Sequence, residues 1–470
     1  MTTDRWRMGF HIMPPTGWLN DPNGLCQFHG IYHVFHQYSP DWPAPGAPRG
    51  WGHATSRDLI NWEHHGMAIR PDTPDEAQGS YSGCAVRVGT GADEHLRFYY
   101  TGNVKEPGDF DYIHTGRRAA QLLIESPDGF ELGEKRVLLR NEDYPANCTL
   151  HVRDPKVWVD ADGTWWMLLG ARDVDDCGMV LVLSSADGIA WTVVREIYPC
   201  APFGFMWECP DRIELDGHVY LSCCPQGMAA FPWASGMRDV AGYFPLPEGA
   251  DLSTFDQAIP AESFRLWDHG FDFYAPQTFT EEQGRTLLIG WMGMPEAPYE
   301  SAPDNLSWCH CLTVPRVLTR QADGVIAQAP APELDGLHEQ EEALVANDMN
   351  VLSGHRHDLV IEGIDDPFSL TLDDELEIVF EDGSLTLRFT ARGAASIGAG
   401  RTERSCAVEN LSDVRVLVDS SAVEVFANGG RIVFATRWFP CADTCIVRLV
   451  GSTPSARAWR MGDGMRGTYA

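Results

Sequence analysis

Short runs of apolar residues, either continuous or alternating with polar ones, recur along the first 330 residues. Strict alternation is the pattern of a half-buried strand, and short continuous apolar runs are typical of fully buried strands. Almost no segment in this part has the 3.6-residue period of a helix. The clearest predicted strands are residues 96–104, 164–172, 178–185, 218–224 and 285–293.

Asp-Gly pairs separate many of these runs, as they do in tight β-hairpins. The pairs occur at 128–129, 162–163, 187–188, 216–217 and 382–383. So many short antiparallel strands exceed an ordinary sandwich, and a propeller built from repeated four-stranded sheets fits the length better. No strong sequence repeat marks the blades of a propeller, so the pattern alone predicts a large all-β domain over residues 1–327.

The pattern changes at residues 328–350, which open Pro-rich and then become acidic. We predict a linker here, and its middle, around Leu334, Leu337 and Leu344, has the spacing of one helix. Alternating strands return beyond the linker, with an Asn-Gly-Gly turn at 428–430. Residues 351–470 are therefore predicted to form a second domain, a β-sandwich.

Charge narrows the classes of partner. The chain has 67 Asp and Glu against 35 Lys and Arg, a net charge of −32. A surface this acidic argues against nucleic acids and anionic membranes, because their phosphates would be repelled. The N-terminal residues carry charges where a signal peptide needs an apolar core, and no run of about 18 apolar residues exists. We predict a cytoplasmic protein.

The cysteines point to the same compartment. Their number, 13, is odd, and they are scattered through a long chain, unlike a secreted disulfide framework. The groups at 223–224 and 309–311 lack the spacing of a zinc site. We expect reduced, mostly buried thiols, and neither a metal nor a cofactor.

Three acidic residues have unusual neighbours. Asp21 lies in WLNDPNG, Asp154 follows Arg153 in HVRDPKVW, and Glu208 lies between Trp207 and Cys209 in FMWECPD. A carboxyl against an apolar wall has a raised pKa, whereas a carboxylate beside arginine stays ionised. Most acids on a surface this acidic are simply solvated, so the aromatic, Cys and Pro neighbours are what single out these three.

Such an asymmetry is what glycoside cleavage requires, because one group donates a proton while another is an ionised nucleophile. Glu208, beside Trp207, is the predicted acid. Asp21, among turn amides, is the predicted nucleophile, and Asp154, paired with Arg153, would hold sugar hydroxyls. The innermost strands of a propeller line one channel, which would bring these distant residues together.

The motifs WLNDPNG, RDP and WECPD, in this order, closely resemble the glycoside hydrolase family of invertases, fructanases and sucrose-6-phosphate hydrolases, family 32. Further segments are similar to the family, and together they span nearly the whole chain. These segments are residues 51–64, 81–83, 98–103, 272–279, 290–292, 312–316 and 419–430.

The resemblance implies a five-bladed β-propeller followed by a C-terminal β-sandwich, and a retaining hydrolase of β-fructofuranosides. It implies that Asp21 is the nucleophile, Glu208 the acid/base and Asp154 the stabiliser of the transition state. Retention further implies that the reacting carboxyls stand about 5 Å apart. The residues expected to bind the sugar are Asn20, Gln37, Trp51, Tyr81, Ser82, Arg153, Tyr274 and Trp291.

One loop departs from the family pattern. Members usually carry a Trp-Gly before WGH, where the Trp borders the fructose pocket, but Pro45-Gly46 falls near that place here. Either Trp42 replaces this Trp or the wall is built differently, which affects the choice of leaving group rather than the reaction.

Several alternatives stay open at this point. Sucrose, sucrose 6-phosphate and short fructo-oligosaccharides are the candidate substrates, and a phosphosugar would need a basic patch such as Arg49, His53 and Arg57. A fructosyltransferase, a sugar-binding protein without catalysis and a scaffold for other proteins are the competing functions. The exposed edges of the sandwich could also pair two copies of the chain.

Overall fold

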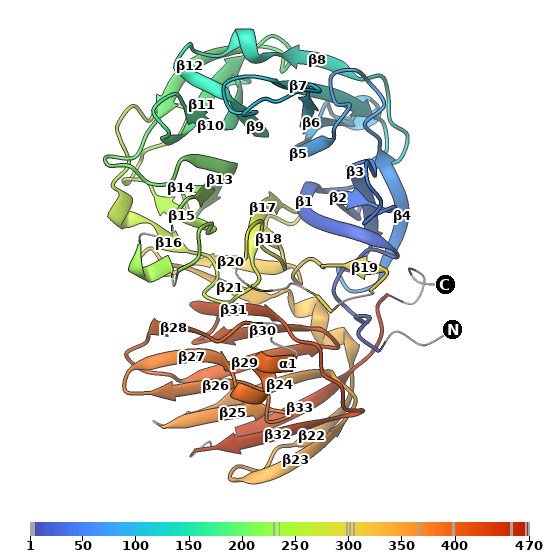
Figure 1. Cartoon of the computed structure of the whole chain (residues 1–470), viewed down its shortest axis with the longest axis vertical. Coiled ribbons are helices and arrows are strands. Elements are labelled where there is room, and N and C mark those ends of the chain that lie inside the picture. The colour runs from blue at the N-terminus through green and yellow to red at the C-terminus, as the bar shows by residue number, and fades with distance from the viewer. Residues whose placement is uncertain are drawn as a thin grey trace.

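The computed structural model describes residues 5–470 except 229–230, 235, 298, 300–301, 304–305, 365–366, 397–399, 452–454, 466–467 and 469–470. Its regular elements are almost all strands, arranged as a ring of sheets above a two-layered β-domain (Figure 1). None of the helices in the described ranges is long and apolar enough to cross a membrane.

The ring contains five sheets within the described residues. The first is β1 (Gly17–Phe28), β2 (Ile31–Ser39), β3 (Gly50–Ser56), β4 (Trp62–Ile69) and β19 (Trp308–Cys309). The second is β5 (Ser80–Val88), β6 (His95–Lys105), β7 (Arg117–Ser126) and β8 (Arg136–Leu139). The third is β9 (Cys148–Val159), β10 (Trp165–Asp173), β11 (Gly178–Ser185) and β12 (Thr192–Ile197).

The fourth sheet is β13 (Met206–Leu215), β14 (His218–Gln226), β15 (Gly242–Pro245) and β16 (Arg265–Leu266). The fifth is β17 (Tyr274–Thr280), β18 (Thr286–Trp291), β20 (Arg316–Arg320) and β21 (Ile326–Pro330). Strand β19 leaves this last part of the chain and pairs in parallel with β1. The first strands also contact one another around the ring, β1 with β5, β5 with β9, β9 with β13, β13 with β17 and β17 with β1. These five strands therefore surround the axis of the ring.

The C-terminal part contains two six-stranded sheets packed face to face (Figure 1). One is β22 (His338–Ala343), β33 (Ser455–Met461), β24 (Arg356–Glu362), β29 (Asp413–Asp419), β30 (Ala422–Ala427) and β31 (Ile432–Arg437). The other is β23 (Asp348–Ser353), β32 (Thr444–Val450), β25 (Phe368–Leu372), β26 (Leu376–Glu381), β27 (Ser384–Phe389) and β28 (Glu403–Ala407). Inward-facing apolar residues of both sheets form one core, so this part is a β-sandwich.

The helices in the described ranges are short. They are η1 (Gly91–Asp93), η2 (Asn141–Asp143), η3 (Pro232–Ala234), η4 (Ala261–Ser263), η5 (Pro332–Leu337) and α1 (Ala391–Ser396). All 13 cysteines, each of them described, carry free thiols, and most are buried.

The predicted strands are present, but the Asp-Gly pairs differ: those at 216–217 and 382–383 form two-residue turns, whereas those at 128–129 and 187–188 lie in longer connections. Residues 96–104 and 164–172 fall on β6 and β10, and the Asp216-Gly217 pair joins β13 to β14 as a two-residue turn. Both turn residues have positive φ, 51° and 74°. This conformation favours glycine and tolerates aspartate, which is why the pair is a hairpin signal.

Residues 328–350 differ from the predicted linker. They contain the end of β21, which completes the fifth sheet, then η5, then β22, which pairs with β33 of the sandwich. The predicted helix is only the 3₁₀-helix η5, which buries Leu334 and Leu337, and Leu344 lies beyond β22. Propeller and sandwich therefore follow one another with almost no free chain between them.

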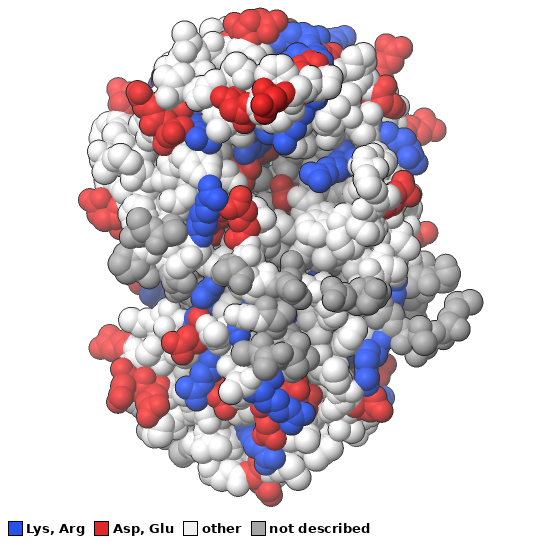
Figure 2. All heavy atoms as spheres, in the orientation of Figure 1, with Lys and Arg blue, Asp and Glu red and all other residues white. Residues whose placement is uncertain are grey.

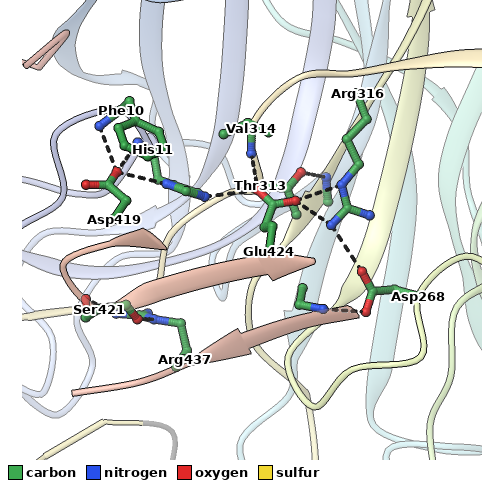
Figure 3. Close-up of polar contacts among 12 residues, drawn as sticks. Phe10, His11, Asp268, Thr313, Val314, Arg316, Asp419, Ser421, Glu424 and Arg437 are labelled. Carbon is green, nitrogen blue, oxygen red and sulfur yellow. Dashed lines mark hydrogen bonds and ion pairs between the residues drawn. The ribbon is translucent and has the colours of Figure 1, made fainter. Parts of the chain in front are cut away.

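A buried polar network joins the two parts (Figure 3). The ring of His11, from the N-terminal segment, lies 2.9 Å from Asp419 through Nδ1 and 2.9 Å from Glu424 through Nε2. Burial alone would lower the pKa of His11, but these two carboxylates outweigh burial and raise it to about 9.

The same network continues to the fifth sheet. Arg316 donates to Glu424 from Nε and Nη2, at 2.8 and 2.6 Å, and to Asp268 at 3.1 Å. All these side chains are fully buried. Sandwich carboxylates thus neutralise propeller cations across the junction, and removing one partner would leave a buried charge uncompensated, which costs several kcal/mol, about 3–5.

Candidate active site

A cavity of about 1110 Å³ opens at the ring and contains all three predicted acids. Asp21 comes from β1, Asp154 from β9 and Glu208 from β13. These are three of the five strands that surround the axis, which explains how residues far apart in the sequence reach one cavity. Figure 2 shows the upper part of the molecule hollowed near its middle, with Lys and Arg side chains beside the hollow.

A local irregularity aims the acids into the cavity. The pairing register shifts between Leu19 and Pro22 in β1, between Arg153 and Lys156 in β9 and between Glu208 and Asp211 in β13. Such β-bulges re-aim side chains, and they tolerate proline, which has no N–H for the ladder. Asp154 and Cys209 also have positive φ, 64° and 45°, a strain of order 1–3 kcal/mol each that is typical of functional sites.

The carboxyl of Asp21 is held by two donors. Ser82 on β5 donates from Oγ to Oδ2 at 2.6 Å, and Asn20 donates from Nδ2 to Oδ1 at 3.0 Å. Burial raises the pKa of Asp21 to about 6; the Ser82 hydrogen bond opposes this rise, and the charge of Glu208 adds to it. Asp21 is therefore mostly ionised at neutral pH and becomes protonated in mild acid.

Asp154 lies deeper. Its Oδ2 accepts from the backbone N–H of Cys209 at 3.0 Å, and the residue is 5% exposed. Burial raises the pKa of Asp154 to about 7, with Arg153 opposing the rise and Glu208 adding to it. Arg153 forms an ion pair with Asp154 at 3.7 Å, but its Nε and Nη2 hydrogen bonds go to Glu208 instead.

Glu208 has polar surroundings, not the predicted apolar wall. Its Oε1 accepts from Arg153 at 2.6 Å and 3.1 Å, and its Oε2 accepts from the hydroxyl of Tyr274 at 2.8 Å. The indole of Trp207 is fully buried and donates to the carbonyl of Phe203. Neighbours on a strand face opposite sides, so Trp207 packs behind the sheet while Glu208 faces the cavity.

The structure places seven of the eight predicted sugar-binding residues on the cavity and excludes one. The seven are Asn20, Gln37, Tyr81, Ser82, Arg153, Tyr274 and Trp291. Trp51 is fully buried in a core cluster with Phe35 and Phe98, and its indole N–H donates to the carbonyl of Tyr81 at 2.9 Å. It supports the cavity wall from behind, because β3 is the third strand from the axis.

Two family models match the chain. The model "Glycosyl hydrolases family 32 N-terminal domain" covers residues 11–330, and "Glycosyl hydrolases family 32 C terminal" covers residues 377–458. The chain belongs to glycoside hydrolase family 32.

Individual family 32 proteins are similar over their full length. A sucrose-6-phosphate hydrolase of Bacillus subtilis (strain 168) is 35% identical over 456 residues, which cover 93% of this chain and 90% of the relative. The solved structure of sucrose-6-phosphate hydrolase from Lactobacillus gasseri has a TM-score of 0.84 and 26% identity, and covers 98% of this chain and 94% of that chain. A mutant of the Bombyx mori beta-fructofuranosidase in complex with sucrose has a TM-score of 0.79 and 28% identity, with 98% and 95% covered.

An aromatic wall lines one part of the cavity of this family 32 protein. The ring of Trp18 lies 5.3 Å from that of Trp42 and 6.3 Å from that of Trp291, between centroids. Trp42 therefore lines the cavity, as does the Pro45-Gly46 segment of the same loop. Such rings suit the apolar face of a sugar, whose rim is polar.

Basic residues line the cavity as well, and sequence reasoning found two of them, Arg153 and Arg49. Arg49 lines the cavity, but His53 is buried against Phe35, with ring centroids 4.0 Å apart, and Arg57 does not line it. Lys105, Arg117 and His151 were missed. Their signal was weak, because nothing in the sequence distinguishes a lysine or arginine at a strand end from a solvated one.

His151 orients Arg153. The guanidinium donates from Nη1 to Nδ1 of His151 at 2.9 Å, while Nε2 of the same ring donates to the carbonyl of Tyr112 at 2.9 Å. Burial, with the charge of Arg153 next, lowers the pKa of His151 to about 2. The neutral ring can therefore accept from Arg153, which turns the guanidinium toward Glu208.

Proposed function

We propose that this protein is a retaining β-fructofuranosidase that hydrolyses terminal β-D-fructosyl units of sucrose, sucrose 6-phosphate or short fructo-oligosaccharides. The observation that carries the proposal is the meeting of Asp21, Asp154 and Glu208, from three inner strands, in one cavity with an aromatic wall. The family membership and the activities of the relatives support the same reaction.

In the first step, a carboxylate oxygen of Asp21 attacks the anomeric C2 of the fructosyl unit. The bond from C2 to the leaving oxygen breaks, and that oxygen takes a proton from Glu208. A fructosyl ester of Asp21 forms. Arg153 and Tyr274 donate to the two oxygens of the Glu208 carboxylate that remains.

In the second step, Glu208 takes a proton from water, and the resulting hydroxide attacks C2 and releases the Asp21 carboxylate. Two displacements retain the configuration. Asp154 has the role of holding fructosyl hydroxyls and stabilising positive charge as it develops on the ring. Asn20, Gln37, Ser82 and Trp291 complete the fructosyl subsite, and no metal or cofactor takes part.

The architecture assigned to this activity follows the sheets. Each of the five ring sheets is one blade of a five-bladed propeller, which ends at Pro330 with β21. The sandwich begins at His338 with β22. A cytoplasmic location and a homo-oligomer formed through the sandwich remain predictions, which cell fractionation and light scattering of the purified chain test.

The variant Asp21→Asn tests the nucleophile. It keeps the shape of the side chain but removes the attacking carboxylate, so turnover of sucrose should fall by about 10⁴-fold or more while the fold is unchanged. Near-normal rates would show that Asp21 is not the nucleophile.

Glu208→Ala tests the acid. It should slow substrates with poor leaving groups most, because good leaving groups need no proton. A direct test of retention is methanolysis, which should give methyl β-fructofuranoside; the α-anomer would contradict the double displacement.

A further inference from the structure

Three cationic side chains reach the catalytic cavity from different segments. Arg49 directly precedes β3, Lys105 ends β6 and Arg117 begins β7, and all three line the cavity. Lys105 and Arg117 stand directly opposite each other in the register of β6 and β7. Like charges in such a pair are destabilising, so the fold carries a cost at this position that a neutral pair would not have.

Within the described ranges, no carboxylate lies in ion-pair contact with this cluster. Among the described residues, the side chains of Arg49, Lys105 and Arg117 form no hydrogen bond or ion pair; the Lys105 ammonium only lies over the ring of Tyr112, 5.2 Å from its centroid. The Nε of Arg117 is buried without a partner. By contrast, the next residue, Arg118, pairs with Glu106 at 2.9 Å.

Scarcity of acids does not explain the unpaired charges, because the chain has 67 Asp and Glu against 35 Lys and Arg. Burial lowers the pKa of Lys105, and the charges of Arg117, Arg49 and Arg153 lower it further. The cations thus repel one another, and a bound anion would relieve this repulsion. A neutral sugar offers no charge to balance them.

The cluster lies on the side of the leaving group. The Lys105 ammonium lies over the ring of Tyr112, and the carbonyl of Tyr112 accepts from His151. His151 in turn accepts from Arg153, which donates to Glu208, so the cluster adjoins the residues around the proton that goes to the leaving oxygen. Asp21, which attacks the fructosyl unit, is held by Ser82 and Asn20 instead. An anion bound by the cluster therefore belongs to the unit that departs and not to the fructosyl unit.

We propose that Lys105 and Arg117, together with Arg49, form a subsite for a phosphate group on the leaving hexose of a phosphorylated disaccharide. The inference rests on the proposed β-fructofuranosidase activity. A phosphate monoester carries between one and two negative charges at neutral pH and offers three acceptor oxygens. The ammonium of Lys105 and the planar fork of Arg117 match such a group, and sucrose 6-phosphate, with its phosphate on the glucosyl unit, has the required chemistry.

The test compares kcat/KM for sucrose 6-phosphate with kcat/KM for sucrose in the wild type, Lys105→Gln, Arg117→Gln and the double variant. Each lost charge-assisted contact should lower the ratio of the two values by about tenfold or more, and the double variant should lower it most. The conservative variant Lys105→Arg should keep most of the ratio. Arg118→Gln is the matched control, because its side chain pairs with Glu106 and does not line the cavity, and it should leave the ratio unchanged.

An unchanged ratio in a double variant that still hydrolyses sucrose would overturn the phosphate subsite and leave the proposed function intact. A wild type that hydrolyses neither substrate would overturn the proposed function itself. In a second experiment, inorganic phosphate is added as a competitor. It should inhibit hydrolysis of sucrose by the wild type and inhibit the double variant less. Inhibition by phosphate without any preference for sucrose 6-phosphate would mean that the cluster holds a free anion, which also contradicts the proposal.

Discussion

Replacing Ser82 by alanine should move the acid limb of the pH–activity profile upward by about one to two pH units. Asp21 attacks as a carboxylate, and burial already raises its pKa to about 6, while the 2.6 Å hydrogen bond from Ser82 lowers it. A hydrogen bond to a charged group contributes about 1.5–3 kcal/mol, and one pKa unit corresponds to about 1.4 kcal/mol. Loss of the hydroxyl therefore raises the pKa of Asp21 to a value near or above neutrality.

The sign follows from the role of the group. The active form is deprotonated, so kcat/KM falls about tenfold for each pH unit below the pKa of Asp21. The wild type should lose activity below about pH 6, and Ser82→Ala should lose it from a higher pH but recover most of it in mild alkali.

The assay is kcat/KM on sucrose between about pH 4 and about pH 9. Ser80→Ala is the matched control, since Ser80 lies two residues earlier on β5 and donates to Glu76, not to Asp21. Its acid limb should coincide with that of the wild type. An unshifted limb in Ser82→Ala, or an equal loss at every pH, would refute the reasoning.

Three further perturbations separate the roles of other residues. Tyr274→Phe removes the donor to Glu208 at 2.8 Å, so kcat on sucrose should fall about tenfold to a hundredfold with a smaller change in KM. Trp51→Ala should lower the free energy of unfolding in urea by about 3–5 kcal/mol, because it empties a core position; an intact stability with a raised KM would instead make it a sugar platform. His11→Gln should destabilise the protein most below about pH 6.5, where the protonated ring contributes about 3 kcal/mol to the free energy of unfolding. Because the folded pKa of His11 lies above the ordinary 6.5, the difference in stability from the wild type should vanish as the pH rises through about 9. A difference in stability that is independent of pH would contradict a charged His11.

The fold was predictable where the hydrophobic pattern of the sequence is typical of the secondary-structure element that forms. Buried strands such as β10 and β11 are apolar along most of their length, and Asp216-Gly217 marks its hairpin by the positive φ that it adopts. Strand β22 was missed, because its sequence, HEQEEA, is polar at nearly every position and mostly exposed. An edge strand that pairs on one side and faces water carries no hydrophobic pattern, so acidic composition suggested a linker instead.

Site residues that belong to a recognisable motif could be predicted from the sequence. Residues whose position at the cavity or behind it depends only on packing were harder to predict. Trp51 and Trp291 are both almost completely buried, yet only Trp291 ends a strand at the cavity. Their sequence contexts do not separate these two outcomes. A usable signal went unnoticed: a proline follows the site residue in β1 and β9 and comes two residues after Glu208 and Tyr274 in β13 and β17. It marks the bulge of four of the five inner strands, whereas β5 has its register shift without a proline.

The sandwich contributes to the site although none of its residues lines the described cavity wall. Asp272, fully buried, accepts from Arg401 of the sandwich at 2.9 and 2.8 Å and from the backbone N–H of Arg437 at 2.8 Å. Two residues later, Tyr274 begins β17 and donates to Glu208. A catalytic group functions only when held within about 0.5 Å of its productive position, and Ala275, with φ of 46°, makes this segment strained. The sandwich thus fixes the segment that positions the acid, which gives a physical reason for joining the two domains through buried charges rather than through a flexible linker.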